Sequence, residues 1–182
     1  MHMNDVTERP LGVSIIAVWQ VIVAMFFVLL LVVARLQPGN LADLDRGFAT
    51  IGISGKWILG SVVTIAALTF LSGIGLWTGE RAGWWLGCFC SLYGVLGIFA
   101  SMQTAVRLSQ RFGVAGLTSE TSLRFAVRLA INLGILFYLM RADVMDYLDV
   151  PYESRFRSLG YISIGVITIY GITLLLGRTT VG

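Results

Sequence analysis

The stretch GIGLWTGERAGWW, residues 73–85, joins two long apolar runs through the polar turn Thr78-Gly79-Glu80-Arg81-Ala82. The runs on either side, about 57–77 and 83–106, are each long enough to cross the roughly 30 Å hydrocarbon core of a bilayer as a helix. A connection this short leaves two helices antiparallel and adjacent. The sequence therefore predicts a transmembrane helical hairpin.

Three more apolar runs lie outside this hairpin, at about 11–35, 123–140 and 159–177. The first follows Pro10, which suits a first helical turn because its missing N–H would have no intrahelical partner. That run is also longer than the roughly 7–15 apolar residues of a signal peptide, so we expect a retained helix. We predict an all-α, polytopic transmembrane helical bundle with five spans. It would form one domain over 1–182, a four-helix core plus one C-terminal helix.

The composition places the chain among membrane proteins. It is 57% hydrophobic and 13% charged, whereas soluble domains are about 45–50% apolar and 25% charged. We expect a multi-pass protein of the cell membrane, specifically a bacterial inner membrane. The net charge of +3 comes from arginines dispersed at the ends of the runs, which predicts contact with lipid headgroups and no nucleic-acid partner.

Lysine and arginine residues near the ends of the runs bear on which side faces the cytoplasm. The side of the N-terminus would hold Arg9, Arg81, Arg141, Arg155 and Arg157. The other side would hold Arg35, Arg46, Lys56, Arg107, Arg111, Arg124, Arg128 and Arg178. A count of five against eight places the N-terminus outside the cytoplasm, but the margin falls to five against six without the two arginines of the fourth run. The charges therefore leave the orientation open.

The apolar runs carry no catalytic pattern, because none contains a histidine or a carboxylate. Cys88 and Cys90 are two positions apart on a helix, so they point about 200° apart and cannot share a metal ion. We interpret both as packing residues. The single histidine, His2, leaves haem and chlorin groups without an axial ligand in the membrane. We predict no enzyme, no cofactor and no metal site.

Two connecting segments show their own patterns. In 37–56, the spacing of Leu41, Leu44 and Phe48 favours a short interfacial helix. The segment 141–157 spaces its acidic residues along one helical face, interrupted by Pro151, and these residues are Asp143, Asp146, Asp149 and Glu153. We interpret them as a solvated acidic stripe at the membrane surface, in preference to a cation site.

Small residues recur along the run 83–106 at alternating spacings of four and three. This small-residue seam consists of Gly83, Gly87, Cys90, Gly94, Gly97, Ser101 and Thr104. Such stripes let two membrane helices approach closely, and a period of 3.5 favours a left-handed crossing. A weaker stripe in the fourth run, Ala126, Ala130 and Gly134, is a candidate mate. The partner is either a helix of the same chain, which we favour, or a second copy or another subunit.

The fourth run also carries polar residues that could contact lipid or an anion, namely Arg124, Arg128 and Asn132. Arg128 lies close enough to Arg141 that the helix between them, about 18 Å long, is shorter than the bilayer core. We favour an arginine that extends to the headgroups, with Glu120 supporting Arg124 one turn away. The alternative is an anionic-lipid or substrate site within the helices.

Three stretches near the ends of the runs stand out: Arg9-Pro10-Leu11-Gly12-Val13, Gly73-Ile74-Gly75-Leu76-Trp77 with Gly83-Trp84-Trp85, and Leu136-Phe137-Tyr138-Leu139-Met140-Arg141. With these stretches, about residues 9–148 resemble small, uncharacterised bacterial integral membrane proteins with a four-helix core, a domain of unknown function. The resemblance implies topology only, because that family has no assigned activity to transfer. The extra C-terminal helix departs from the four-helix pattern.

We therefore expect a non-enzymatic membrane protein that acts through helix–helix association. It would serve as an accessory or stabilising subunit of a larger membrane complex, or associate with a second copy. The alternative is a small transporter or lipid-binding protein that uses a polar track on the fourth run, comprising Arg124, Arg128, Asn132 and Tyr138.

Overall fold

A computed structural model describes residues 9–36, 55–112, 119–151 and 155–179 of the chain. These residues are helical almost throughout and include no strand. The helices are α1 (Leu11–Leu36), α3 (Gly55–Thr78), α4 (Arg81–Phe112), α5 (Ser119–Leu139), α6 (Ala142–Tyr147) and α7 (Arg155–Thr179).

Within the described residues, four segments are long and apolar enough to cross a membrane: Leu11–Leu36, Leu59–Thr78, Arg81–Val106 and Glu120–Leu139. The apolar part of α7 over which side chains are described, Phe156–Ile172, is shorter than these four. These helices confirm two parts of the prediction: the described chain is all-helical, and it contains helices of membrane-spanning length and composition.

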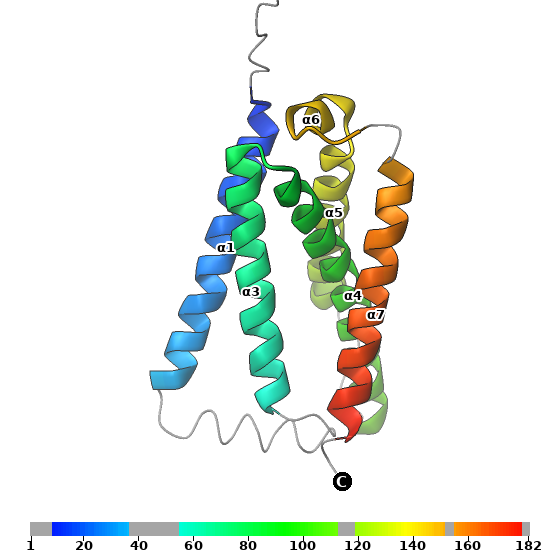
Figure 1. The fold of residues 1–182 in the computed structure, drawn as a ribbon. Coiled ribbons are helices and arrows are strands. Elements are labelled where there is room, and N and C mark those ends of the chain that lie inside the picture. The colour runs from blue at the N-terminus through cyan, green and yellow to red at the C-terminus, as the bar shows by residue number, and fades with distance from the viewer. Residues whose placement is uncertain (1–8, 37–54, 113–118, 152–154, 180–182) are drawn as a thin grey trace, which may run out of the picture.

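The hairpin between α3 and α4 has a specific local cause. Gly79 adopts a positive φ of 77°, a conformation that suits glycine at the end of a helix. The backbone N–H of Glu80 then donates to the carbonyl of Gly75 at 2.8 Å, which closes the last turn of α3. One residue later α4 begins, so the two helices run antiparallel (Figure 1).

The central helix is α4, which contacts α3, α5 and α7, while α1 packs along α3. Successive long helices run in opposite directions, and the start of α1 and the end of α7 lie at opposite ends of the molecule (Figure 1). The buried face of α1 has helical spacing and consists of Val13, Ile16, Ala17, Gln20 and Ala24.

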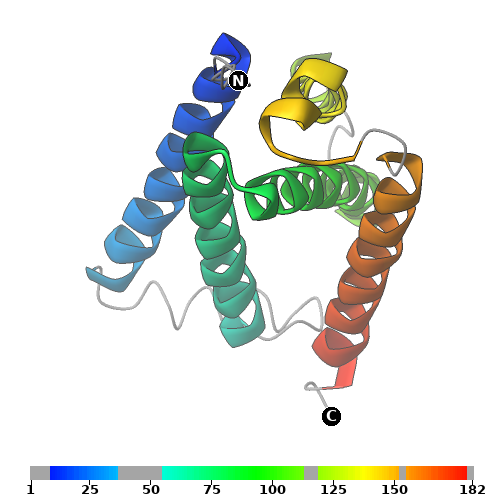
Figure 2. The same ribbon diagram turned by 45° about the horizontal axis from the view of Figure 1, so that its top comes forward.

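The hydrophobic core is concentrated at one end of the molecule. Its residues are Val13, Ile16, Ala17, Leu76, Trp84, Cys88, Leu136, Leu139, Val144, Met145, Leu148, Val150, Ile162 and Val166. They come from the first half of α1, the end of α3, the start of α4, the end of α5, the α6 region and the first half of α7. These segments gather around the α3–α4 turn (Figures 1 and 2). We call this the packed end, and the other the open end.

Arginine and aromatic side chains cover the packed end. Arg9 lies 4.4 Å from the ring centroid of Trp77, and its Nε donates to the hydroxyl of Tyr147 at 3.1 Å. Arg81 donates from Nε to the backbone carbonyl of Asp149 at 2.8 Å. These contacts tie the start of α1 and the α3–α4 turn to α6. Arg and aromatic residues in such a layer are typical of a membrane–water interface.

The acidic segment after α5 is partly helical. Asp143 and Asp146 lie exposed on α6, and Asp143 accepts a hydrogen bond from Arg141 at 3.1 Å. Asp149 follows α6 with a positive φ of 51° and is held by Arg81. Asp143 and Asp149 therefore sit at the surface beside arginines. Glu153 and the interfacial helix expected in 37–56, up to residue 54, fall outside the described residues.

Candidate functional site

The small-residue seam of α4 begins in close contact with α3. A Cβ added to Gly75 would lie 2.7 Å from the Cα of Gly83, a separation that no real side chain tolerates. Beside this contact the hydroxyl of Ser72 donates to the carbonyl of Gly83 at 3.2 Å. Glycine at both positions therefore allows the two backbones to touch.

The next two members of the seam lie where several helices meet. A Cβ on Gly87 would lie 3.0 Å from Leu139 of α5, 3.2 Å from Ser72 of α3 and 3.6 Å from Gln20 of α1. Cys90 accepts a hydrogen bond from the Thr69 hydroxyl at 3.7 Å, a normal length for sulfur. This part of the seam thus packs against other helices of the same chain.

Gly94 is the last seam residue with a close neighbour on another described helix. A Cβ there would lie 2.5 Å from Oδ1 of Asn132 on α5. The other side of the same amide, Nδ2, donates to the backbone carbonyl of Arg128 at 2.8 Å. Asn132 is therefore oriented by its own helix and directed at α4.

Beyond Gly94 the seam has no partner in the described chain. A Cβ on Gly97 would meet no atom within 4 Å. Ser101 and Thr104 are exposed, and their hydroxyls donate to carbonyls of their own helix, those of Gly97 and Ala100. We call Gly97, Ser101 and Thr104 the open seam.

The stripe of α5 that we predicted to pack against the small-residue seam lies on a different face of that helix. A Cβ on Gly134 would meet nothing within 4 Å, and Ala126 and Ala130 are exposed, so this stripe of α5 does not face α4. The face of α5 that meets α4 instead carries Asn132 and Leu139. The reason is helical rotation, because two faces of α5 have similar spacing and only one of them can meet α4.

The charged residues of α5 lie at its start, away from the core. Arg124 is exposed and pairs with Glu120 one turn earlier, as the spacing predicts. Arg128 is exposed, and its guanidinium makes no hydrogen bond or ion pair with the part of the chain that the structure describes. Tyr138, the fourth member of the proposed track, packs against Gly12 of α1 near the other end of α5. The four side chains therefore do not gather around one cavity.

Gln20 is a buried amide that sequence patterns do not single out. It lies on the buried face of α1, 5% exposed, and its Oε1 has no hydrogen-bond donor among the described residues. A buried acceptor without a donor costs about 1–3 kcal/mol. The only sequence signal is one amide in an otherwise apolar stretch, which does not reveal whether it faces lipid or protein.

Groups that could hold a metal are absent from the described residues, since no three of their His, Cys, Asp or Glu side chains come together. No family model, curated protein or solved structure matches the chain.

Proposed function

We propose that this chain is a non-enzymatic integral membrane protein that acts through helix–helix association. Its role would be that of an accessory or stabilising subunit of a larger membrane complex, with a second copy of itself as the other candidate partner. The observation that carries the proposal is the division of the α4 seam. Gly83, Gly87, Cys90 and Gly94 pack within the chain, while the open seam continues the same spacing without a partner among the described residues.

The helices around the open seam support this proposal. Ser101 and Thr104 of the open seam are exposed on α4, and α7, which contacts α4, exposes Ile164, Ile167 and Ile172. Apolar exposure alone is normal in lipid, but a small-residue stripe permits the close backbone approach on which membrane helix pairs depend. The open seam therefore suits a transmembrane helix as partner.

We further propose that α7 is a fifth span. It has 25 residues, which correspond to about 37 Å. It contacts α4 and runs from the packed end of the molecule to the open end (Figure 1). Five spans would agree with the start of α1 and the end of α7 lying at opposite ends of the molecule (Figure 1). We also propose that the chain resembles the four-helix bacterial membrane proteins and lies in a bacterial inner membrane. The four apolar helices that precede α7 support both proposals.

The experiment that tests association is photo-crosslinking in native membranes. A photoreactive amino acid placed at Ser101 should crosslink to a transmembrane partner, and the same residue at Ala130 should not. Both positions are exposed, on α4 and α5, and each lies 11 positions from the helix terminus at the open end, Phe112 or Ser119. Equal crosslinking at the two sites, or lipid adducts alone at Ser101, would refute the proposal.

The alternative proposal is a small transporter or lipid-binding protein that uses the polar residues of α5. Its support is Arg128, an exposed cation one turn before an amide that faces α4. The arrangement favours it less, because Arg124 is paired with Glu120 and Tyr138 packs against Gly12. This alternative requires substrate-dependent thermal stabilisation that Arg128→Ala abolishes.

A further inference from the structure

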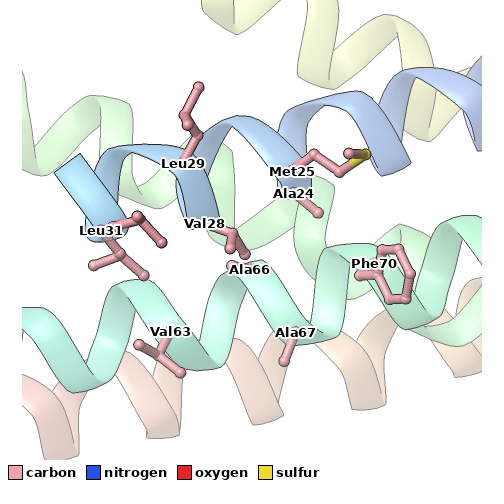
Figure 3. A pocket seen from close by; sticks show the side chains of 10 residues that line it. Ala24, Met25, Val28, Leu29, Leu31, Val63, Ala66, Ala67 and Phe70 are labelled. Atoms are coloured by element: carbon pink, nitrogen blue, oxygen red, sulfur yellow. The ribbon is translucent and has the colours of Figure 1, made fainter.

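An apolar groove lies between the second half of α1 and the first half of α3. One hollow of about 530 Å³ is lined by residues that include Ala24, Val28 and Ala66. A second, of about 410 Å³, shares Val28, Leu31, Val32 and Val63 with the first and extends to Arg35. In Figure 3, Val28 of α1 and Ala66 of α3 point into the space between the two helices. The two hollows form one continuous groove of a size that suits a small ligand.

The groove exists because α1 and α3 diverge. Near the packed end the helices are in close contact, since a Cβ on Gly73 would lie 2.9 Å from the carbonyl oxygen of Ala17. At Ala24 and Ala66 both side chains are still buried, but Val28 and Val63 further along are about half exposed. Figure 1 shows the same divergence toward the open end. An unfilled space between membrane helices would forfeit dispersion contacts on both walls, so something in the membrane fills it.

The depth of the groove matches one leaflet of a bilayer. Ala24 and Arg35 are 11 positions apart on α1, a rise of about 16 Å. Half of the hydrocarbon core is about 15 Å. The walls are apolar along this whole length, and among the described residues that line them the one charged side chain is Arg35 at the outer end. Hydrocarbon toward the midplane and a cation at headgroup depth are the two features that a bound phospholipid requires.

We propose that this groove is a binding site for one anionic phospholipid, with an acyl chain between α1 and α3 and its phosphate on the Arg35 guanidinium. A guanidinium matches phosphate oxygens through paired N–H donors. A transmembrane helix fits less well, because it would cross both leaflets whereas the groove closes at Ala24 and Ala66. The site is independent of the open seam on α4.

The test is native mass spectrometry of the full-length protein with phosphatidylglycerol and phosphatidylcholine of identical acyl chains. The wild type should retain one lipid and prefer phosphatidylglycerol by about fivefold, the effect of one basic residue on anionic-lipid binding. Arg35→Gln should remove that preference. Arg157→Gln, on an exposed arginine of α7 that does not line the groove, should retain it.

A second pair of variants tests the acyl-chain site. Val28→Trp fills the groove and should weaken both lipids roughly tenfold. Val33→Trp is the control, because Val33 is similarly exposed on the same half of α1 and does not line the groove. If Val28→Trp fails to fold, Val63→Trp blocks the groove from the α3 wall.

Three results would overturn the proposal. One is equal lipid binding by the groove-filling variant and Val33→Trp. Another is a phosphatidylglycerol preference that survives Arg35→Gln. The last is a photoreactive residue at Val28 that captures a protein helix instead of lipid, which would make the groove a helix-docking surface.

Discussion

Gly75 and Gly83 bring the backbones of α3 and α4 into direct contact at the hairpin, since a Cβ on Gly75 would lie 2.7 Å from the Cα of Gly83. The contact sits beside the Gly79 turn and next to Trp84, which is fully buried. It fixes the separation of the two helices at the packed end. A methyl group at either glycine would have to push the helices apart.

Gly83→Ala should therefore lower the free energy of unfolding by about 1–3 kcal/mol, the usual cost of overpacking. Thermal unfolding in detergent micelles measures it. Gly134→Ala is the control, because a Cβ there meets no neighbour within 4 Å. An equal effect of the two substitutions would show that Gly83 is not a contact residue.

Substitutions in the two halves of the seam should have different effects on the stability of the isolated monomer. Gly94→Leu places a side chain against Asn132 and should destabilise the monomer by about 1–3 kcal/mol. Gly97→Leu, one helical turn further, should leave the monomer unchanged. Unfolding in detergent at low protein concentration makes the comparison. Unchanged folding of Gly94→Leu would contradict the assignment of the first half to internal packing.

Among the aromatic residues of the packed end, substitution of Trp84 should lower the stability of the protein most. Its Nε1 donates to the carbonyl of Leu139 at 2.7 Å and links α4 to the end of α5. Trp84→Phe should cost about 1–3 kcal/mol, because it leaves a buried carbonyl unpaired. Trp85→Phe should cost less, since Trp85 is only partly buried and contacts Trp84 edge-on at 5.5 Å. The reverse order would refute this role of the hydrogen bond.

A substitution that removes the unpaired oxygen of Gln20 should stabilise the protein. Gln20→Leu is expected to raise the free energy of unfolding by about 1 kcal/mol, whereas Gln20→Ala should lower it by leaving a cavity. Chemical unfolding of both variants checks the signs. Loss of stability in Gln20→Leu would mean that Oε1 has a donor after all, such as a buried water.

The sequence predicted those elements that depend on composition and local signals. Apolar run lengths placed the four span-length helices, and the Gly79 turn with its short connection placed the hairpin. The ends of the helices were harder to predict from the sequence. The helix α4 continues past Val106 to Phe112 because arginine is a good helix former and hydropathy does not register helix outside the bilayer core. The short helix α6 follows from the buried Val144 and Met145, whose packing no local pattern reveals.

The candidate site was harder to predict, because it depends on how helices rotate and cross. Gly94 and Gly97 are indistinguishable in the sequence, yet one faces Asn132 and the other faces no described residue. The Ala126, Ala130 and Gly134 stripe has suitable spacing on the wrong face of α5. The groove that ends at Arg35 requires the divergence of α1 from α3, and spacing alone does not set a crossing angle.

The most direct measurement of the central claim is the mass of the particle gently solubilised from native membranes, for the wild type, Gly97→Leu and Gly134→Leu. Both substitutions change a helical glycine with no neighbour within 4 Å, and only Gly97 lies on the open seam. The account predicts a stoichiometric assembly for the wild type and for Gly134→Leu, and release of the folded monomer for Gly97→Leu. A wild-type particle with the mass of one chain, or an assembly that survives Gly97→Leu unchanged, would contradict it.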